Sequence, residues 1–295
     1  MSKKIHITVG IPAYNEARNI SNLIYNIQAQ KAECFILDSI IVSSDGSDDQ
    51  TVSRASAFEH VIVIDDGLRK GKTMRMNEMF LVSQSEIIVI VDADIQLDST
   101  ALEHLVKPFQ DDSGVMLVSG NLSPSKSNTI AGEISYVSYY LWDTAIKLIS
   151  NSDMYHCGGA LRAFRKPFYK DLFFPPITAD DVYPYFVCVQ RGYKFLYISA
   201  ILGSYKLPST MGDFRRQQKR FLESETVQEG SFGTPLVKEL YTIVPMIKLR
   251  ALLKTLIHSP LFTIAYLVVW FPIKLSSMLF KPKITGAWDS VVSTK

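Results

Sequence analysis

The chain has 295 residues, of which 47% are hydrophobic and 20% charged, so it is globular and long enough for one large α/β domain or a domain with an appendage. Its net charge of +2 is too small to indicate nucleic-acid binding. Three widely spaced cysteines, Cys34, Cys157 and Cys188, predict neither a disulfide framework nor a zinc site, and they favour a reducing compartment.

The first half of the sequence alternates apolar runs with amphipathic segments. The expected strands span residues 5–11, 39–44, 61–64, 87–91 and 115–118, with helices from about residue 16, after the polar break at 45–50, and over 72–83 and 100–109. The runs VIVI and IIVIV are apolar on both faces, as in buried parallel strands. The pattern predicts a mostly parallel, twisted sheet flanked by helices, with ligands bound beyond the carboxyl ends of the strands.

The second half is expected to contain helices at 132–150, 180–191 and 212–230 and a strand at 193–199. Residues 255–273 carry no Asp, Glu, Lys or Arg, and such a run is long enough to cross a bilayer. Pro260, Pro272 and His258 weaken that interpretation, and a buried core helix is the alternative. Spanning the membrane and lying in its interface both stay open, since basic residues flank both ends of the run.

This composition divides the chain into two expected parts. Residues 1–230 would form the catalytic domain, and residues 231–295 a membrane-associated helical segment and tail. The start of the chain, MSKKIHITVGIPAYNE, enters a strand pattern without a secretory signal. We therefore expect a membrane-associated protein whose catalytic domain faces the cytoplasm.

Acidic residues follow two of the predicted strands directly. Asp92 and Asp94 come after EIIVIV, and residues two apart on a continuing strand point to the same side. Magnesium typically takes one or two carboxylates together with substrate phosphates, so this pair predicts a metal–diphosphate site. Asp45 likewise follows the strand DSIIV, although such acids are also common turn formers and helix caps.

The ordered motifs resemble those of the family 2 glycosyltransferases. They are VGIPAYNE (9–16), SDGSDD (44–49), DAD (92–94), CGGALRAFRK (157–166), TADD (178–181) and QQKRF (217–221). The resemblance covers roughly residues 5–225, and it implies a GT-A fold and inversion of the anomeric centre.

The resemblance also implies residue roles. Asp94 would bind Mg²⁺ or Mn²⁺, and Asp181 would be the general base, in an Asp180-Asp181 pair where the family has Glu-Asp. Phe221 stands where processive members have Trp, next to an Arg that contacts diphosphate. The residues expected to bind the nucleotide-sugar are Pro12, Ala13, Tyr14, Glu16, Asp45, Lys72, Asp92, Gln217 and Arg220. For the segment 69–72, a solvated basic turn is the alternative.

The expected reaction is metal-dependent, inverting transfer of a sugar from a nucleotide-sugar, by default a UDP-sugar. The acceptor would be a hydroxyl of a lipid-linked or membrane-proximal glycan, because the apolar run places the enzyme at a membrane. A membrane-attached nucleotide-sugar-binding protein without transferase activity is one alternative, and a processive polysaccharide synthase subunit is another. Gly158 and Gly159 fit either a tight turn or close approach of backbone to a sugar.

Overall fold

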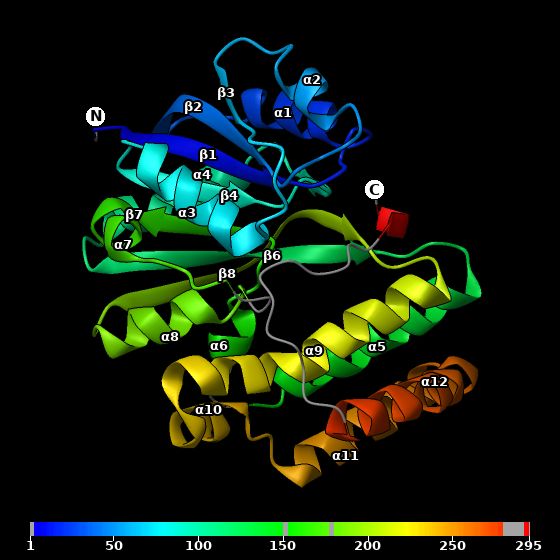
Figure 1. Ribbon diagram of the computed structural model, residues 1–295. Coiled ribbons are helices and arrows are strands. Elements are labelled where there is room, and N and C mark those ends of the chain that lie inside the picture. Colours follow the sequence, from blue (N-terminus) through cyan, green and yellow to red (C-terminus); the bar gives the residue numbers. More distant parts are fainter. Residues whose placement is uncertain (1–2, 150–152, 177–179, 280–291, 295) are drawn as a thin grey trace.

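A computed structural model describes residues 3–149, 153–176, 180–279 and 292–294 (Figure 1). Within them lies one eight-stranded sheet with the strand order β3-β2-β1-β4-β7-β6-β8-β5. The strands are β1 (Ile5–Ala13), β2 (Phe35–Ser44), β3 (Val61–Ile64), β4 (Ile87–Val91), β5 (Ile95–Leu97), β6 (Val115–Ser125), β7 (Leu161–Arg165) and β8 (Lys194–Lys206). Helices pack on the sheet, so the predicted α/β architecture is confirmed.

The sheet changes direction beside β4. Strands β1 to β4 are parallel, as are β6 and β8, whereas β7 runs antiparallel to both β4 and β6. The short β5, which the sequence did not predict, pairs antiparallel with β8. In open α/β sheets, ligands bind beyond the carboxyl ends of the strands where the strand order switches. The segment after β4, which carries Asp92 and Asp94, lies at such a point.

Two apolar cores cover the two faces of the sheet. One contains α1 (Ile20–Gln28), α2 (Thr51–Ala55) and α4 (Ala101–Asp111). The other contains α3 (Lys72–Val82), α7 (Lys166–Asp171), α8 (Tyr183–Gln190) and α10 (Thr234–Tyr241).

Strand β4 supplies both cores, because successive residues of a strand point to opposite faces. Ile87, Val89 and Val91 enter the first core, and Ile88 and Ile90 enter the second. Each of these fully buried side chains contributes about 1.5–3 kcal/mol of hydrophobic free energy.

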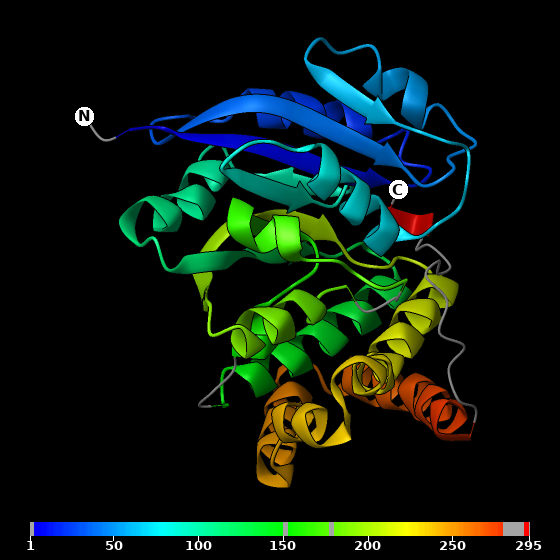
Figure 2. The same ribbon diagram turned by 60° about the vertical axis from the view of Figure 1, so that its left-hand side comes forward.

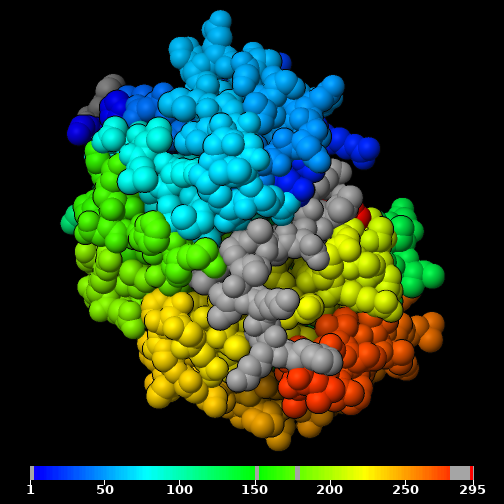
Figure 3. Space-filling view, viewed as in Figure 1, coloured from blue at the N-terminus to red at the C-terminus, as the bar shows by residue number. Residues whose placement is uncertain are grey.

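A third layer joins the C-terminal helices to this body (Figure 2). It consists of α5 (Ile130–Ile146), α9 (Met211–Phe232), α11 (Pro245–His258) and α12 (Pro260–Leu279). Ile134 and Val137 of α5, Phe214 of α9 and Tyr266 of α12 form its core. In the space-filling view, α11 and α12 lie at the end of the molecule opposite β1–β3 (Figure 3).

The uncharged run 255–273 is divided between two helices, and the expected apolar C-terminal helix is α12. Helix α11 ends at His258, and α12 begins at Pro260 after Ser259. Proline has no N–H to donate and a fixed φ, so it interrupts a helix and suits the start of the next one. Among the described residues, α12 is the one helix long and apolar enough to cross a membrane by length and composition.

Other boundaries also differ from the expectation. The helix expected from residue 16 begins at Ile20, since Asn15 has φ 53° and the segment before Ile20 is bound to a neighbouring loop. Strands β2, β6 and β8 are longer than predicted. Helix α9 extends past residue 230, and Val237 of α10 is fully buried in the second core. The domain boundary at 230 stays a prediction.

Candidate active site

One cavity of about 530 Å³ opens beyond the carboxyl ends of β1, β2 and β4, between these strands and helices α5 and α9. Every residue that the sequence nominated lines it, so Asp45, Asp94 and Asp181 share one cleft. Their roles remain predictions. The nominated residues are Pro12, Ala13, Tyr14, Glu16, Asp45, Lys72, Asp92, Asp94, Asp181, Gln217 and Arg220.

The exit of β1 is joined to the exit of β2 by hydrogen bonds. The Asp45 N–H donates to the Ala13 carbonyl at 2.8 Å, and the Asn15 N–H donates to Ser47 Oγ at 3.0 Å. The Glu16 N–H donates to Thr51 Oγ1 at 2.7 Å. The motifs PAYNE and SDGSDD therefore form one rigid edge of the cavity.

Asp45 is a buried anchor for the segment 69–71. Its Oδ1 accepts hydrogen bonds from the backbone N–H groups of Lys70 and Gly71 at 2.7 and 2.8 Å, and its Oδ2 lies 3.0 Å from Arg69 Nε. The Arg69 guanidinium in turn lies 3.3 Å from the centroid of the Tyr14 ring. Asp45 thus fixes a cation over an aromatic ring on the cavity wall, a contact that the sequence did not predict.

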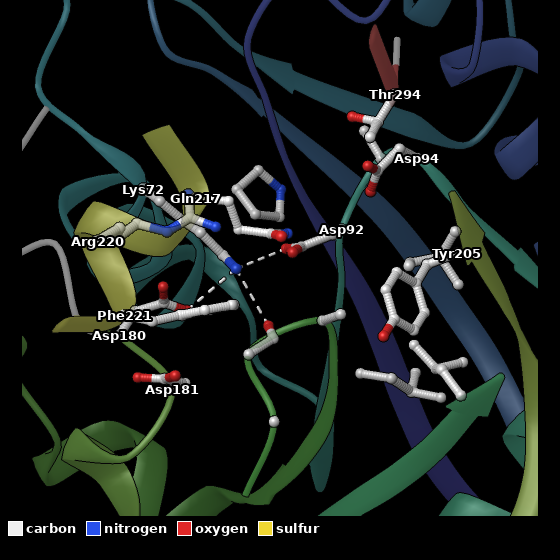
Figure 4. A pocket seen from close by; sticks show the side chains of 18 of the residues that line it. Lys72, Asp92, Asp94, Asp180, Asp181, Tyr205, Gln217, Arg220, Phe221 and Thr294 are labelled. Carbon is white, nitrogen blue, oxygen red and sulfur yellow. Dashed lines mark hydrogen bonds and ion pairs between the residues drawn. The ribbon is translucent and has the colours of Figure 1, made fainter. Parts of the chain in front are cut away.

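Lys72 is largely buried and bridges two acids, so it is not part of a solvated turn (Figure 4). Its Nζ lies 2.6 Å from Asp92 Oδ1 and 3.0 Å from Asp180 Oδ2. The contact with Asp92 Oδ1 is an ion pair whose geometry is not that of a hydrogen bond. It also donates to the Gly159 carbonyl at 3.1 Å. Burial lowers the pKa of Lys72, but the charges of Asp180 and Asp92 outweigh burial and raise it. Lys72 is therefore a fixed cation.

Arg162 of β7 binds the Asp180-Asp181 segment through its guanidinium. It is fully buried, and its Nη1 donates to the carbonyls of both aspartates at 2.6 and 3.0 Å. Its Nη2 lies 2.8 Å from Asp180 Oδ2. An arginine inside the apolar strand LRAFR is a signal that could have drawn attention to this residue, because arginine is almost never fully buried unless paired.

The two neighbouring aspartates have opposite electrostatic environments. Burial raises the pKa of Asp180, but the charges of Lys72 and Arg162 outweigh it and hold that pKa below its ordinary value. Burial, and then the charge of Asp180, raise the pKa of Asp181. The Asp181 carboxylate accepts a hydrogen bond from the Val182 N–H at 3.0 Å. Asp180 is therefore held as an ion, whereas Asp181 is the stronger proton acceptor.

Gly159 permits this arrangement through its missing side chain. A Cβ at Gly159 would lie 3.2 Å from Asp180 Oδ2 and 3.6 Å from Lys72 Nζ, whereas one at Gly158 would meet nothing within 4 Å. Close approach of the backbone therefore explains Gly159.

Asp92 and Asp94 present two carboxylates to the cavity. Burial, and then the charge of Asp92, raise the pKa of Asp94, which a hydrogen bond from the Thr294 side chain opposes. Figure 4 shows Thr294 beside Asp94. No group of three or more His, Cys, Asp or Glu side chains suited to a metal lies within the described ranges. Two carboxylates on one cavity wall, of which Asp92 is also paired with Lys72, fit a divalent cation that takes its other ligands from a phosphate-containing substrate and water.

Helix α9 supplies the remaining nominated residues. Gln217, Arg220 and Phe221 line the cavity, and Phe221 is about half exposed at its rim. Arg220 lines the same cavity as Asp180 and Asp181, and its charge is one of the effects that act to lower the pKa of both acids.

The cavity has a further wall that the sequence did not predict. It comprises side chains of α5 and β8 and of α6 (Asp153–His156), and among them are Tyr139, Trp142, Asp143, Tyr155, His156, Tyr197 and Tyr205. Residues 139, 142, 143 and 146 follow the spacing of one helix face, which is the signal that could have indicated it.

Comparison with known proteins identifies the family of the chain. Residues 8–173 match the model of the family described as Glycosyl transferase family 2. The poly-β-1,6-N-acetyl-D-glucosamine synthase of Staphylococcus aureus (strain COL) is 23% identical over 241 residues, which are 79% of this chain and 58% of that protein. The Staphylococcus epidermidis synthase of that name is 21% identical over 245 residues, 80% of this chain and 59% of its own length. The chain thus spans less than two thirds of these relatives.

Solved structures share the fold. A mannosyltransferase from Pyrobaculum calidifontis, in complex with GDP-Man and Mn²⁺, superposes with a TM-score of 0.61 at 18% identity, covering 96% of this chain and 77% of its own. Glucosyl-3-phosphoglycerate synthase from Mycobacterium tuberculosis, in complex with Mn²⁺, UDP and glucosyl-3-phosphoglycerate, gives 0.57 at 16% identity, covering 78% and 81%. The GT-A fold expected from the motifs is confirmed.

Proposed function

Because the chain belongs to glycosyl transferase family 2, we propose that it transfers a sugar from a nucleotide-sugar to a glycan hydroxyl with inversion. The observation that carries this proposal is the shared cavity, in which Asp94 and Asp181 stand with the nominated donor residues. The donor would be a UDP-sugar by default. The relatives' names, and the neighbours solved with UDP or GDP-Man, support a nucleotide-sugar.

The nucleoside would bind at the edge formed by the β1 and β2 exits. Tyr14 and Arg69 offer a ring and a guanidinium held by Asp45, both suited to a planar base. The buried cation Lys72 and the guanidinium of Arg220 would face the diphosphate. Their positive charge would stabilise the leaving group as it becomes more negative.

Asp94, with Asp92 beside it, would hold Mg²⁺ or Mn²⁺. When bound, such a cation supplies Lewis-acid stabilisation of the departing diphosphate. The neighbours crystallised with Mn²⁺ support a divalent metal.

Asp181 would remove the proton from the attacking hydroxyl. The acceptor oxygen forms its bond to the anomeric carbon as the bond to the diphosphate oxygen breaks, and the hydroxyl proton passes to the Asp181 carboxylate. Its raised pKa suits it to accept that proton. Asp180 would stay ionised and keep Lys72 in place. The contrast between the two acids supports Asp181 as the base.

Membrane association is the second part of the proposal, and an interfacial arrangement fits better than a span. Thr263 and Tyr266 of α12 are buried against the protein, whereas Leu261 and Val268 are 79% and 68% exposed. On α11, Ile257 is 84% exposed, and Lys248, Arg250 and Lys254 are exposed around it. An apolar face flanked by cations suits the interface of an anionic leaflet.

The relatives' names and the cavity position of Gln217, Arg220 and Phe221 favour a second candidate, processive synthesis. A donor screen tests both. Purified chain is incubated with UDP- and GDP-sugars and glycan acceptors, with Mn²⁺ omitted and restored, while nucleoside diphosphate release and product length are measured. We expect metal-dependent release and addition of one sugar. Long products would favour processivity, and tight donor binding without release would favour a binding protein.

A further inference from the structure

One wall of the cavity has no part in the donor site proposed above. We call Tyr139, Trp142, Asp143, Tyr155, Tyr197 and Tyr205 the aromatic wall. Figure 4 shows Tyr205 of this wall pointing into the same cavity as Asp92 and Asp94.

Three rings of the wall, those of Trp142, Tyr155 and Tyr197, are held in place by packing. Trp142 meets Tyr155 edge to face with ring centroids 5.2 Å apart, and the Tyr155 hydroxyl donates to the Leu240 carbonyl at 3.2 Å. Tyr197 stacks on His156 at 4.1 Å. Fixed rings lose little conformational freedom when they bind a ligand.

Polar groups of the wall remain available to a ligand. Within the described part of the chain, the hydroxyls of Tyr139, Tyr197 and Tyr205 make no hydrogen bond, and Asp143 is paired at one oxygen, Oδ2, with Lys147 at 2.7 Å. Asp143 lines the same cavity as these three tyrosines. Burial raises the pKa of all three, and the charge of Asp143 adds to that effect. A carboxylate acceptor among hydroxyls suits a ligand rich in hydroxyl groups.

The charge of the wall disfavours an anion. Asp143 is its charged member, and its partner Lys147 is an exposed residue that does not line the cavity. Burial lowers the pKa of His156 despite the nearby Asp153 and Asp143, so this imidazole is neutral at pH 7. Lys206, which lines the cavity next to Tyr205, donates to Asn19 Oδ1 at 3.4 Å. A phosphate or carboxylate placed against Asp143 would meet the negative charge of that side chain.

The aromatic wall and the proposed base, Asp181, line the same cavity. Cys157, the residue after His156, contacts the Asp181 carbonyl through its Sγ at 3.3 Å. The chain next to α6 therefore contacts the Asp181 segment, and a ligand on the wall would share the cavity with the acid pair.

We propose that the aromatic wall is the acceptor subsite and that it binds a neutral pyranose unit of a glycan. The sugar's apolar face would lie against Trp142 and Tyr155, and one of its hydroxyls would donate to Asp143. This inference rests on the proposed function, and it narrows the acceptor class from lipid-linked or membrane-proximal glycans in general to a neutral sugar at the reacting end.

The first test is steady-state kinetics with a donor that the wild type uses. The acceptors are a β-1,6-linked N-acetylglucosamine pentamer, a β-1,4-linked glucose pentamer and glucose 6-phosphate. We expect a neutral pentamer to be preferred by the wild type. Asp143→Asn should raise KM for that pentamer at least tenfold, and Tyr197→Phe, which removes one hydroxyl, about threefold. Asp153→Asn, which removes a nearby charge outside the cavity, should leave KM unchanged. Preference for glucose 6-phosphate, or a KM for Asp143→Asn within twofold of wild type, overturns the inference.

The second test separates this inference from the proposed function. Saturation-transfer NMR measures binding of the pentamers in the presence of UDP and Mn²⁺, without turnover. Signal with the wild type and with Asp153→Asn, but not with Asp143→Asn, supports the subsite even if no donor is turned over, in which case the proposed function alone fails. The opposite result is donor turnover together with a pentamer signal that neither Asp143→Asn nor Tyr197→Phe changes. That result overturns the acceptor subsite and leaves the proposed function intact. Should Asp143→Asn fail to fold, Tyr197→Phe decides.

Discussion

Lys72 Nζ lies 3.0 Å from Asp180 Oδ2, so a residue at the start of α3 is tied to the acid pair on the other side of the cavity. The same ammonium lies 2.6 Å from Asp92. This one cation therefore compensates a carboxylate proposed to face the donor and another beside the proposed base. The charge balance of the proposed donor site and that of the acid pair therefore both depend on Lys72.

Lys72→Met should destabilise the fold. Breaking a buried ion pair by removing one partner leaves an uncompensated charge and costs about 3–5 kcal/mol. Chemical denaturation measures the loss. The double variant Lys72→Met/Asp180→Asn should recover part of it, since one orphaned charge is then removed as well. Equal losses in the single and double variants would mean that the two residues are not coupled.

Asp181→Asn should lower the transfer rate about 10²- to 10⁴-fold, the usual contribution of a general base. Its dissociation constant for nucleoside diphosphate should stay near that of wild type, because Asp181 is not placed at the donor. Rates come from coupled diphosphate release and affinities from calorimetry. Asp181→Glu is the matched control and should keep part of the activity. Near wild-type transfer by Asp181→Asn would rule out this base.

The acid limb of the pH–rate profile should lie above pH 3.8, the ordinary pKa of an aspartate. The base must be unprotonated, so kcat/KM falls as pH drops through the raised pKa of Asp181. Asp180→Asn removes a charge that raises this pKa, so the limb should move to lower pH. Rates are normalised to the folded fraction from circular dichroism. A limb that does not move in Asp180→Asn contradicts the assignment.

Asp94→Ala should weaken the metal-dependent part of nucleotide binding. We expect the gain in affinity that Mn²⁺ gives the wild type to fall at least about tenfold, which is 1.4 kcal/mol. Titration calorimetry with Mn²⁺ or with chelator measures it. Asp98→Asn, an exposed acid outside the cavity, is the control and should retain the full gain. An unchanged Mn²⁺ effect in Asp94→Ala would remove this residue from the metal site.

Ile257→Glu/Val268→Glu should weaken binding to vesicles that contain phosphatidylglycerol. Each change loses about 1.5–3 kcal/mol of apolar burial, so co-sedimentation should fall at least about tenfold. Leu81→Glu is the matched control, because Leu81 is equally apolar and 75% exposed but lies on α3. Loss of binding in the control as well would argue for misfolding or a nonspecific charge effect.

One group of the residues that sequence reasoning found directly follows apolar strands. Asp45, Asp92 and Asp94 were predictable because the carboxyl ends of parallel strands in one sheet meet at one edge, and the β2 and β4 patterns were unambiguous. The ordered motifs then supplied Asp181, Gln217 and Arg220, which no periodicity indicates. The cavity brings both sets together.

What sequence reasoning missed depends on contacts between distant segments. Arg162 contacts Asp180 and Asp181 from the antiparallel strand β7. The place of that strand in the sheet order cannot be predicted from the local sequence. Thr294 reaches Asp94 from the far end of the chain. Asp143 lies on the aromatic-rich helix α5, whose sequence is also typical of a helix packed in a protein core. The break at Ser259–Pro260 was indicated by the proline itself, whereas the length of the uncharged run favoured one continuous segment.

Helix α5 carries Tyr139 and Trp142 on its cavity side, while Ile134 and Val137 pack in the core shared with Tyr266 of α12, and Tyr140 stacks on His258 of α11 at 4.2 Å. A single helix thickness, about 10 Å, therefore separates the cavity from the C-terminal pair. Helix α5 acts as a spacer of fixed height. For the proposed membrane-associated enzyme, this helix would set the distance between the membrane surface and the cavity that Asp181 lines.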